Sequence, residues 1–183
     1  MSQFKPLAIL LVDGYNIIGN WSFLKKIRDN EGMEAARRGL IEALSNYSAY
    51  QGYDTRIVFD AHSQDTPASR EEISRNLCVC YTEYGETADT YIEKICAAYS
   101  KEQTKIRARM IVATSDRAQQ LTVVGYGAEW LSAQQLAFEV ELTSKRVRWQ
   151  QRERKKPASR FLANSLDPVA QERLAKLRLG LRS

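Results

Sequence analysis

The segment Leu7–Asn16 reads LAILLVDGYN, and it predicts how the chain folds. Its apolar run from Leu7 to Val12 is continuous, which is typical of a central parallel strand buried on both faces. Asp13 ends the run, and Gly14 follows it. Because open α/β sheets bind ligands beyond the carboxyl ends of their strands, we expect a site to begin at Asp13.

The rest of the chain alternates between short apolar runs and stretches with helical periodicity. This alternation predicts an α/β fold with a central, mainly parallel sheet and helices on both faces. Further strands are expected at 55–59, 77–81, 110–113 and 128–131, and helices at 33–50, 88–101, 116–123 and 132–154.

Two stretches between these elements are interpreted from their turn and cap residues. Residues 14–31 are rich in glycine and asparagine and predict a loop, with a turn of helix near 23–27. Within the polar residues 61–76, Ser69 and Glu72 have the spacing of a capping box and predict a short helix.

Charge divides the chain into two parts. Residues 145–183 hold 12 Lys/Arg and 3 Asp/Glu, whereas residues 1–144 hold 15 and 19. Pro157 marks a break, so we expect a domain over 1–156 and a basic tail over 157–183, with an amphipathic helix starting at Asp167-Pro168. A polyanion bound by the basic part would explain the asymmetry.

Composition places the protein in an ordinary globular class. The chain has 183 residues, 44% hydrophobic and 27% charged, and its first apolar run is too short for a signal or membrane segment. We therefore expect a cytoplasmic protein with no membrane contact. Cys78 and Cys80 are two apart on a predicted strand and lack zinc spacing, so we interpret them as buried apolar residues.

Four aspartates fall where predicted strands end or where a helix begins: Asp13, Asp60, Asp89 and Asp116. Each alone is more often a helix cap or a loop residue. Together they would repel one another unless a cation is bound, and Mg²⁺ or Mn²⁺ prefers such oxygen ligands. Three neighbours could join this predicted metal site: Asn16 and Ser115 as ligand-orienting groups, and Glu93 one helical turn after Asp89.

The motifs LVDGYNII (11–18), VFD (58–60), GETADTYIE (85–93) and TSD (114–116) together resemble the NYN domain, and more closely its YacP-like branch of bacterial and plastid proteins. The resemblance covers about residues 7–150. It implies a PIN-like three-layer sandwich and an endoribonuclease dependent on Mg²⁺ or Mn²⁺. Carried over by position, Asp13, Asn16, Asp60, Asp89 and Asp116 match the family's acidic pocket, with Glu93 a less certain member.

The resemblance also implies a link to mRNA decay and to the ribosome, in a bacterial cytoplasm or a plastid stroma. RNA contacts are expected from the basic stretch, with Trp149 stacking on bases. Arg117 beside Asp116 is a further candidate for phosphate, and His62 for a position near substrate. The expected RNA-binding residues of the basic stretch are Lys145, Arg146, Arg148, Trp149, Arg152, Arg154, Lys155 and Lys156.

Other readings stay open. The chain could be a catalytically silent module that binds RNA or the ribosome through a nuclease-like fold. A phosphohydrolase of the aspartate-nucleophile type needs Asp-x-Asp after the first strand, but the residue two past Asp13 is Tyr15, so this variant is excluded. DNA is not distinguished from RNA by these residues, because acids and metal act alike on both backbones.

Overall fold

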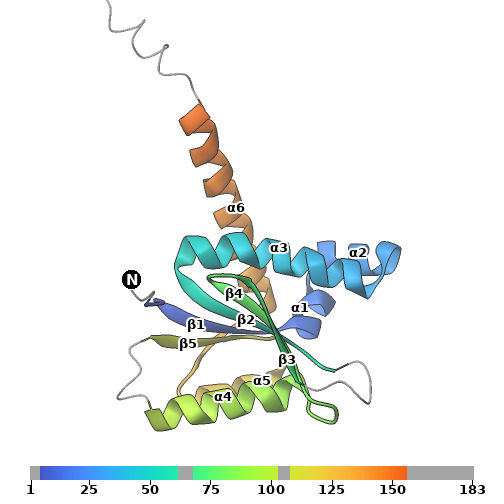
Figure 1. The fold of residues 1–183 in the computed structure, drawn as a ribbon, viewed down its shortest axis with the longest axis vertical. Helices are drawn as coiled ribbons and strands as arrows, with labels where there is room; N and C mark the ends of the chain where they lie inside the picture. Colours follow the sequence, from blue (N-terminus) through green and yellow to red (C-terminus); the bar gives the residue numbers. More distant parts are fainter. Residues whose placement is uncertain (1–4, 62–67, 103–107, 156–183) are drawn as a thin grey trace, which may run out of the picture. The chain divides into compact units, whose positions relative to one another are not determined.

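One sheet forms the centre of the computed structural model, which describes residues 5–61, 68–102 and 108–155 (Figure 1). In those residues six strands lie in the order β3-β4-β2-β1-β5-β6, and only β3 runs antiparallel to its neighbour. The carboxyl ends of the parallel strands therefore meet at one edge of the sheet. The strands are β1 (Ala8–Asp13), β2 (Tyr53–Phe59), β3 (Ser69–Ser74), β4 (Leu77–Tyr81), β5 (Arg109–Ala113) and β6 (Glu129–Leu131).

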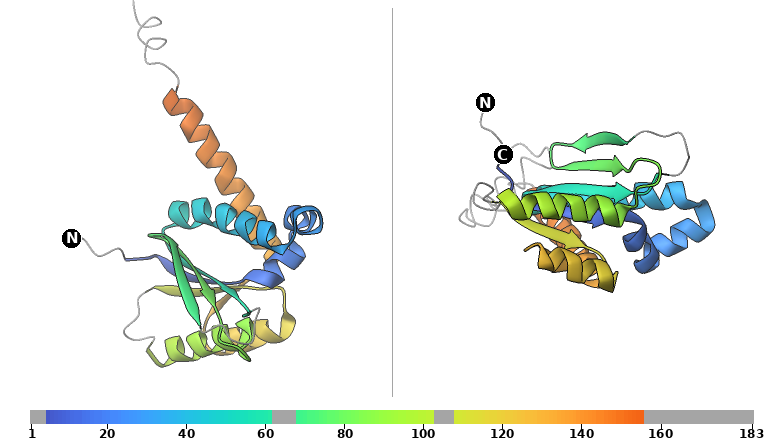
Figure 2. Two further views of the ribbon diagram at one scale, coloured as in Figure 1. Left: turned by 45° about the vertical axis from the view of Figure 1, so that its right-hand side comes forward. Right: turned by 90° about the horizontal axis from the view of Figure 1, so that it is seen from below.

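Helices cover both faces of the sheet, as the opposite positions of α3 and α4 show (Figures 1 and 2). The side chains of β1 alternate between two cores, with Leu10 and Val12 in one and Leu11 in the other. The described helices are α1 (Gly14–Asn20), α2 (Ser22–Glu31), α3 (Met33–Gln51), α4 (Ala88–Glu102), α5 (Arg117–Gly125) and α6 (Ala133–Lys155). The predicted α/β layers are confirmed.

The chain divides into two compact units, residues 1–144 and 145–183, and the sheet belongs to the first. The boundary expected at 156–157 falls at the limit of the described residues, and the expected tail helix at Asp167 lies outside them. No helix in the described part of the chain is long and apolar enough to cross a membrane.

The loop expected over 14–31 is wrong, because these residues form α1 and α2. Asp13 starts α1 by accepting a hydrogen bond from the Asn16 backbone N–H at 3.1 Å. Ile17 and Leu24 are fully buried, and Trp21 donates from its indole to the Ala133 carbonyl at 2.7 Å. Burial of these apolar side chains outweighs the weak helix propensity of the glycines and asparagines.

The short helix expected at Ser69 is also wrong, because residues 69–74 form the edge strand β3. All six residues are exposed, so no buried pattern marks the strand in the sequence. Its structure comes from antiparallel pairing with β4, including Glu71 opposite Val79. Charged side chains on an exposed edge strand also disfavour unwanted pairing with other chains.

Other local predictions are confirmed. Gly52 ends α3 with a left-handed backbone (φ 68°), and the Ser132 hydroxyl accepts from the Gln135 N–H at 3.1 Å at the start of α6. Cys78 and Cys80 are buried on the same side of β4. Local signals of this kind were sufficient to predict helix ends and buried positions where the hydrophobic pattern agreed with them.

Candidate active site at the carboxyl edge of the sheet

Two of the four aspartates accept hydrogen bonds where helices α1 and α4 begin. Asp13, the last residue of β1, accepts from the Asn16 N–H. Asp60 directly follows β2, and its Oδ1 accepts from the Ala88 N–H at the start of α4. The positive end of a helix dipole lies at each of these carboxylates and offsets part of their negative charge.

Asp116 has the same relation to α5. Its Oδ1 accepts from the N–H groups of Ala118 at 2.7 Å and Gln119 at 3.0 Å, and its own N–H donates to the Thr114 hydroxyl at 3.0 Å. The assumption that these acids are uncompensated is therefore wrong in part. Three helix N-termini already offset some of their mutual repulsion.

Asp89 lies in the first turn of α4, next to Ala88, and completes the group. The carboxyl groups of Asp13 and Asp89 approach closely enough for a hydrogen bond that lowers the pKa of Asp89. Burial nevertheless raises the pKa of Asp89 above its ordinary value, and further acids add to this effect. In order, they are Asp116, Asp60 and Glu93.

Asp13 is the most enclosed of the four, with 8% of its surface exposed. Burial is the largest cause of the rise in the pKa of Asp13 to about 7, and the Asn16 N–H opposes it. The remaining causes are the charges of Asp89, Asp60 and Asp116, in that order. The structure thus brings together four aspartates from four places in the sequence.

Within the described residues, no three carboxylate, imidazole or thiolate side chains lie close enough to hold a metal ion together. Mg²⁺ in proteins commonly takes one or two carboxylates and keeps several waters. The contact between Asp13 and Asp89 supplies a pair of this kind. The oxygen donors are therefore compatible with such an ion, held by fewer direct ligands than four.

The carboxamide of Asn16 is engaged with the chain itself. Its Oδ1 accepts from the Ser115 N–H at 2.8 Å and from the Asn20 amide at 3.3 Å. Ser115 Oγ in turn accepts from the Ala133 N–H at 3.2 Å. The Asn16 side chain therefore holds the β5–α5 loop beside α1, and the Ser115 side chain ties the same loop to the start of α6.

The other expected site residues are exposed, belong to the second unit or fall outside the described residues. Arg117 is exposed in the first turn of α5, and His62 lies outside the described residues. Arg146, Arg148, Trp149 and Arg152 are exposed in the second unit, which also contains Lys145. Arg154 and Lys155 belong to α6, and Lys156 is not described.

A row of aromatic rings beside the acids was not anticipated from the sequence. Phe59 packs against Tyr15 at 4.9 Å and stacks on Tyr81 at 5.9 Å between ring centroids. The guanidinium of Arg37 lies 5.9 Å from the Phe59 centroid. The available signal was that Phe59 and Tyr15 each adjoin a strand-end acid or its glycine.

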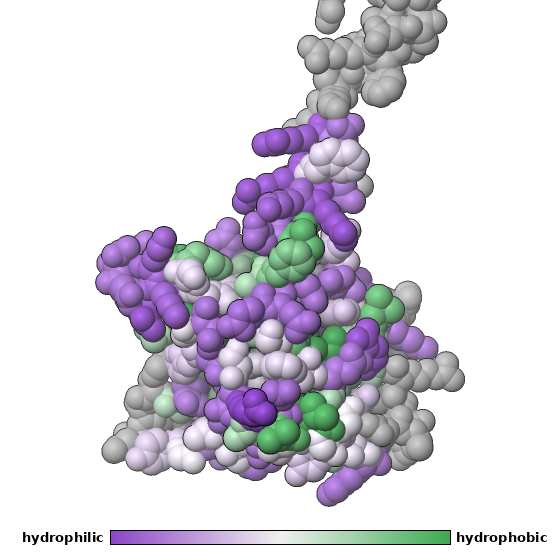
Figure 3. Space-filling model, turned by 180° about the vertical axis from the view of Figure 1, so that it is seen from behind, coloured by the Kyte–Doolittle hydropathy of each residue, from purple (hydrophilic) through white to green (hydrophobic). Residues whose placement is uncertain are grey.

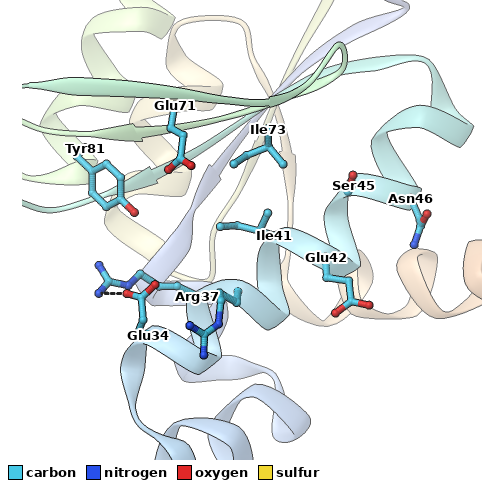
Figure 4. A pocket seen from close by; sticks show the side chains of 10 residues that line it. Glu34, Arg37, Ile41, Glu42, Ser45, Asn46, Glu71, Ile73 and Tyr81 are labelled. Atoms are coloured by element: carbon cyan, nitrogen blue, oxygen red, sulfur yellow. Dashed lines mark ion pairs between the residues drawn. The ribbon is translucent and has the colours of Figure 1, made fainter.

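A groove of about 550 Å³ lies between α3 and the β3–β4 hairpin (Figure 4). Helix α3 lines it with Glu34, Arg37, Arg38, Ile41, Glu42, Ser45 and Asn46, and the hairpin with Glu71, Ile73 and Tyr81. An ion pair at 2.6 Å joins Arg37 to Glu34. The groove is thus a concave feature lined by residues other than the four aspartates.

On the face seen in Figure 3, the exposed apolar side chains of the described residues do not gather into one large surface. On the rear face they form several small groups among hydrophilic side chains (Figure 3). Leu121 and Phe138 are the most exposed aliphatic and aromatic examples in the first unit apart from Leu7. Such scattered residues are ordinary on protein surfaces and indicate no docking face.

Comparison with known proteins agrees with this architecture. The family model described as the YacP-like NYN domain matches residues 10–179, which extends past the 7–150 covered by the motifs. The protein described as "Uncharacterized protein YacP" of Bacillus subtilis (strain 168) is 39% identical over 141 residues, which are 77% of this chain and 79% of that protein.

Two crystal structures of Rae1 (YacP) from Bacillus subtilis are also similar. One has a TM-score of 0.65 and 34% identity, covering 94% of this chain and 95% of its own. The other, of a mutant, has a TM-score of 0.64 and 33% identity, covering 92% and 99%. The expected PIN-like fold is confirmed.

Proposed function

Because the chain belongs to the family of YacP-like NYN domains, we propose that it is a metal-dependent endoribonuclease acting on mRNA. The observation that carries this proposal is the close approach of the Asp13 and Asp89 carboxyl groups among further acids. Burial first, and then the charges of nearby acids, raise the pKa of both groups, which disfavours the folded state at neutral pH. An arrangement of this kind is typical of functional sites.

The donor set fits Mg²⁺ or Mn²⁺, since both ions prefer oxygen ligands. Asp13 and Asp89 would hold the ion, while Asp60, Asp116 and Glu93 would add negative charge around them. When bound, the ion would activate water and neutralise charge on the phosphodiester.

The chain's own groups would position the reaction. Asn16 ties the end of β1 to the β5–α5 loop through Ser115, and so fixes Asp116 relative to Asp13. Arg117 is exposed next to Asp116 and could pair with a phosphate oxygen. The basic residues from Lys145 onward would hold the RNA backbone by contacts that do not depend on base sequence.

The direct test is the cleavage of labelled RNA with Mn²⁺, with and without EDTA. We expect internal cuts by the wild type, and at least a hundredfold slower cleavage by Asp13→Asn with RNA binding retained. Asp29→Asn, an exposed site on α2, is the matched control and should cleave normally. Cleavage by Asp13→Asn at the wild-type rate would refute the assigned site.

The second variable of this test is whether the RNA is free or bound to translating ribosomes. The family resemblance links this branch to translation, so the same variants should also be tested on translating ribosomes. Cuts that occur only on ribosome-bound message would define the substrate as mRNA in that state.

A catalytically silent RNA- or ribosome-binding module is the second candidate. The observation that favours it is that Asp13, Asp60 and Asp116 each cap a helix. Helix capping is by itself a sufficient structural reason for an aspartate at these positions. In that case the wild type would bind RNA without cutting it, whether the RNA is free or bound to translating ribosomes.

A further inference from the structure

One end of the groove between α3 and the β3–β4 hairpin lies at the carboxyl edge of the sheet, the edge that also carries the strand-end aspartates. Tyr81, the last residue of β4, pairs in register with Phe59, and Asp60 follows Phe59. Helix α3 precedes β2 and leads into its amino end, so its first turns, with Arg37, lie toward the carboxyl edge. An RNA strand that runs along this edge of the sheet would reach both the acids and this end of the groove.

The side chains in the groove do not suit a phosphate. Its three glutamates, Glu34, Glu42 and Glu71, outnumber Arg37 and Arg38, and Arg37 is already paired with Glu34 at 2.6 Å. A phosphate entering here would meet net negative charge. The groove would accept a group without charge more readily.

Its remaining walls suit a flat ring. Tyr81 contributes an aromatic side chain that is only partly buried, and Ile41 and Ile73 lie opposite each other (Figure 4). Single-stranded RNA presents unstacked bases, and proteins commonly bind them against aromatic side chains. A volume of about 550 Å³ is in the range of pockets that hold small organic groups.

We propose that this groove binds one unpaired base of the RNA strand whose backbone crosses the acidic pocket, and that Glu71 selects a base with an exocyclic amino group. The proposal rests on the proposed nuclease function and adds a specificity determinant to it. Glu71 points into the groove from β3, on the same side as Tyr81 and Ile73 (Figure 4).

The preference follows from the chemistry of a carboxylate, which only accepts hydrogen bonds when ionised. Adenine, cytosine and guanine each carry an amino group that can donate to it, as cytosine does to Glu or Asp in base recognition. Uracil has no amino group, and two carbonyl oxygens flank its single ring N–H. A carboxylate in the groove therefore disfavours uracil.

The hairpin supplies a matched control in the next residue. Glu71 pairs with Val79, which belongs to the core beneath α3, whereas Glu72 pairs with Cys78 of the opposite core. Glu72 forms an exposed ion pair with Arg70 at 2.7 Å. Glu71→Gln and Glu72→Gln thus make the same change on opposite faces of one exposed strand.

The experiment maps the cuts in an RNA library and measures binding of oligonucleotides that differ at one base. In the wild type we expect uracil to be depleted about five- to tenfold at one fixed position relative to the cut. Glu71→Gln should remove this depletion, because an amide also donates to uracil carbonyls. Glu72→Gln should retain it.

The outcomes separate this proposal from the proposed function. Cleavage with no disfavoured base, or equal preferences in the two variants, would overturn the role of the groove and leave the nuclease assignment intact. RNA binding that disfavours uracil through Glu71 without any cleavage would support the groove and overturn the nuclease.

Discussion

The surroundings of Asp13 act on the protonation of its carboxyl group in two opposite directions. Its carboxyl group caps α1, which favours the ionised form, but its burial and three neighbouring acids favour the protonated form. Burial and the neighbouring negative charges have a larger effect than the cap, and they raise the pKa of Asp13 to about 7. The group is thus held near its titration point at neutral pH, as is common at functional sites.

The raised pKa predicts how stability depends on pH in metal-free protein. An aspartate whose pKa rises on folding stabilises the folded state below its unfolded value, near 3.8, and this stabilisation is lost as pH rises through about 7. Asn carries no charge, so Asp13→Asn should lack this loss. As the pH rises from 5 to 8, we expect the folding stability of the variant to increase by a few kcal/mol relative to that of the wild type.

Thermal unfolding in EDTA at both pH values measures this difference. The Asp29→Asn control makes the same change at an exposed position of α2. A difference in stability between Asp13→Asn and wild type that stays constant with pH would contradict the prediction.

At the scale of elements, the site depends on how closely the start of α1 approaches the end of β2. Gly14 begins α1, and a Cβ atom at this position would lie 2.2 Å from a carbon of the Phe59 ring. Phe59 is fully buried and stacks on Tyr81, so it has little room to move. Packing against Phe59 therefore requires glycine at this position, and the contact lies next to Asp13 and Asp60 in the sequence.

Gly14→Ala should therefore destabilise the protein by about 1–3 kcal/mol, as overpacking does, and should lower RNA cleavage by displacing Asp13. Gly19→Ala, in the same helix, is the control because its Cβ would meet nothing within 4 Å. It should be neutral or stabilise by up to about 1 kcal/mol. Urea unfolding and cleavage rates of both variants provide the measurement, and equal stabilities would contradict the packing argument.

At the scale of the whole molecule, charge is the property that links the two units. The first unit carries the acids, and residues 145–183 carry an excess of nine positive charges. Such an excess raises the local concentration of a polyanion and makes its binding depend on salt. Affinity for RNA and the chemistry of cleavage should therefore respond to different substitutions.

Replacing Arg146 and Arg148 by Gln should lower the salt dependence of RNA affinity by about 1.4 in log–log slope, if both contact phosphates of single strands. The cleavage rate at saturating RNA should stay unchanged. The matched control replaces Lys25 and Lys26, which are exposed on α2. Binding titrations at several salt concentrations decide the matter, and an equal change in both double variants would argue against a specific role of the basic stretch.

Local sequence signals were enough for most elements but not for α1, α2 and β3. Helix α1 depends on the burial of Ile17 and Ile18 in the core, and this burial involves partners distant in sequence. Strand β3 exists through pairing with β4, and its exposed residues carry no hydrophobic alternation. In both cases tertiary contacts override local propensity.

The sequence by itself determined the class of fold, the acids at the strand ends and the division of charge. These properties follow from local periodicity and composition, which are readable along one dimension. Only the tertiary structure decided that Asp13 meets Asp89, that Asn16 holds Ser115 and that a groove forms between α3 and the β3–β4 hairpin. Such relations depend on strand order and packing between distant segments, which set the distances between side chains and therefore their charge interactions.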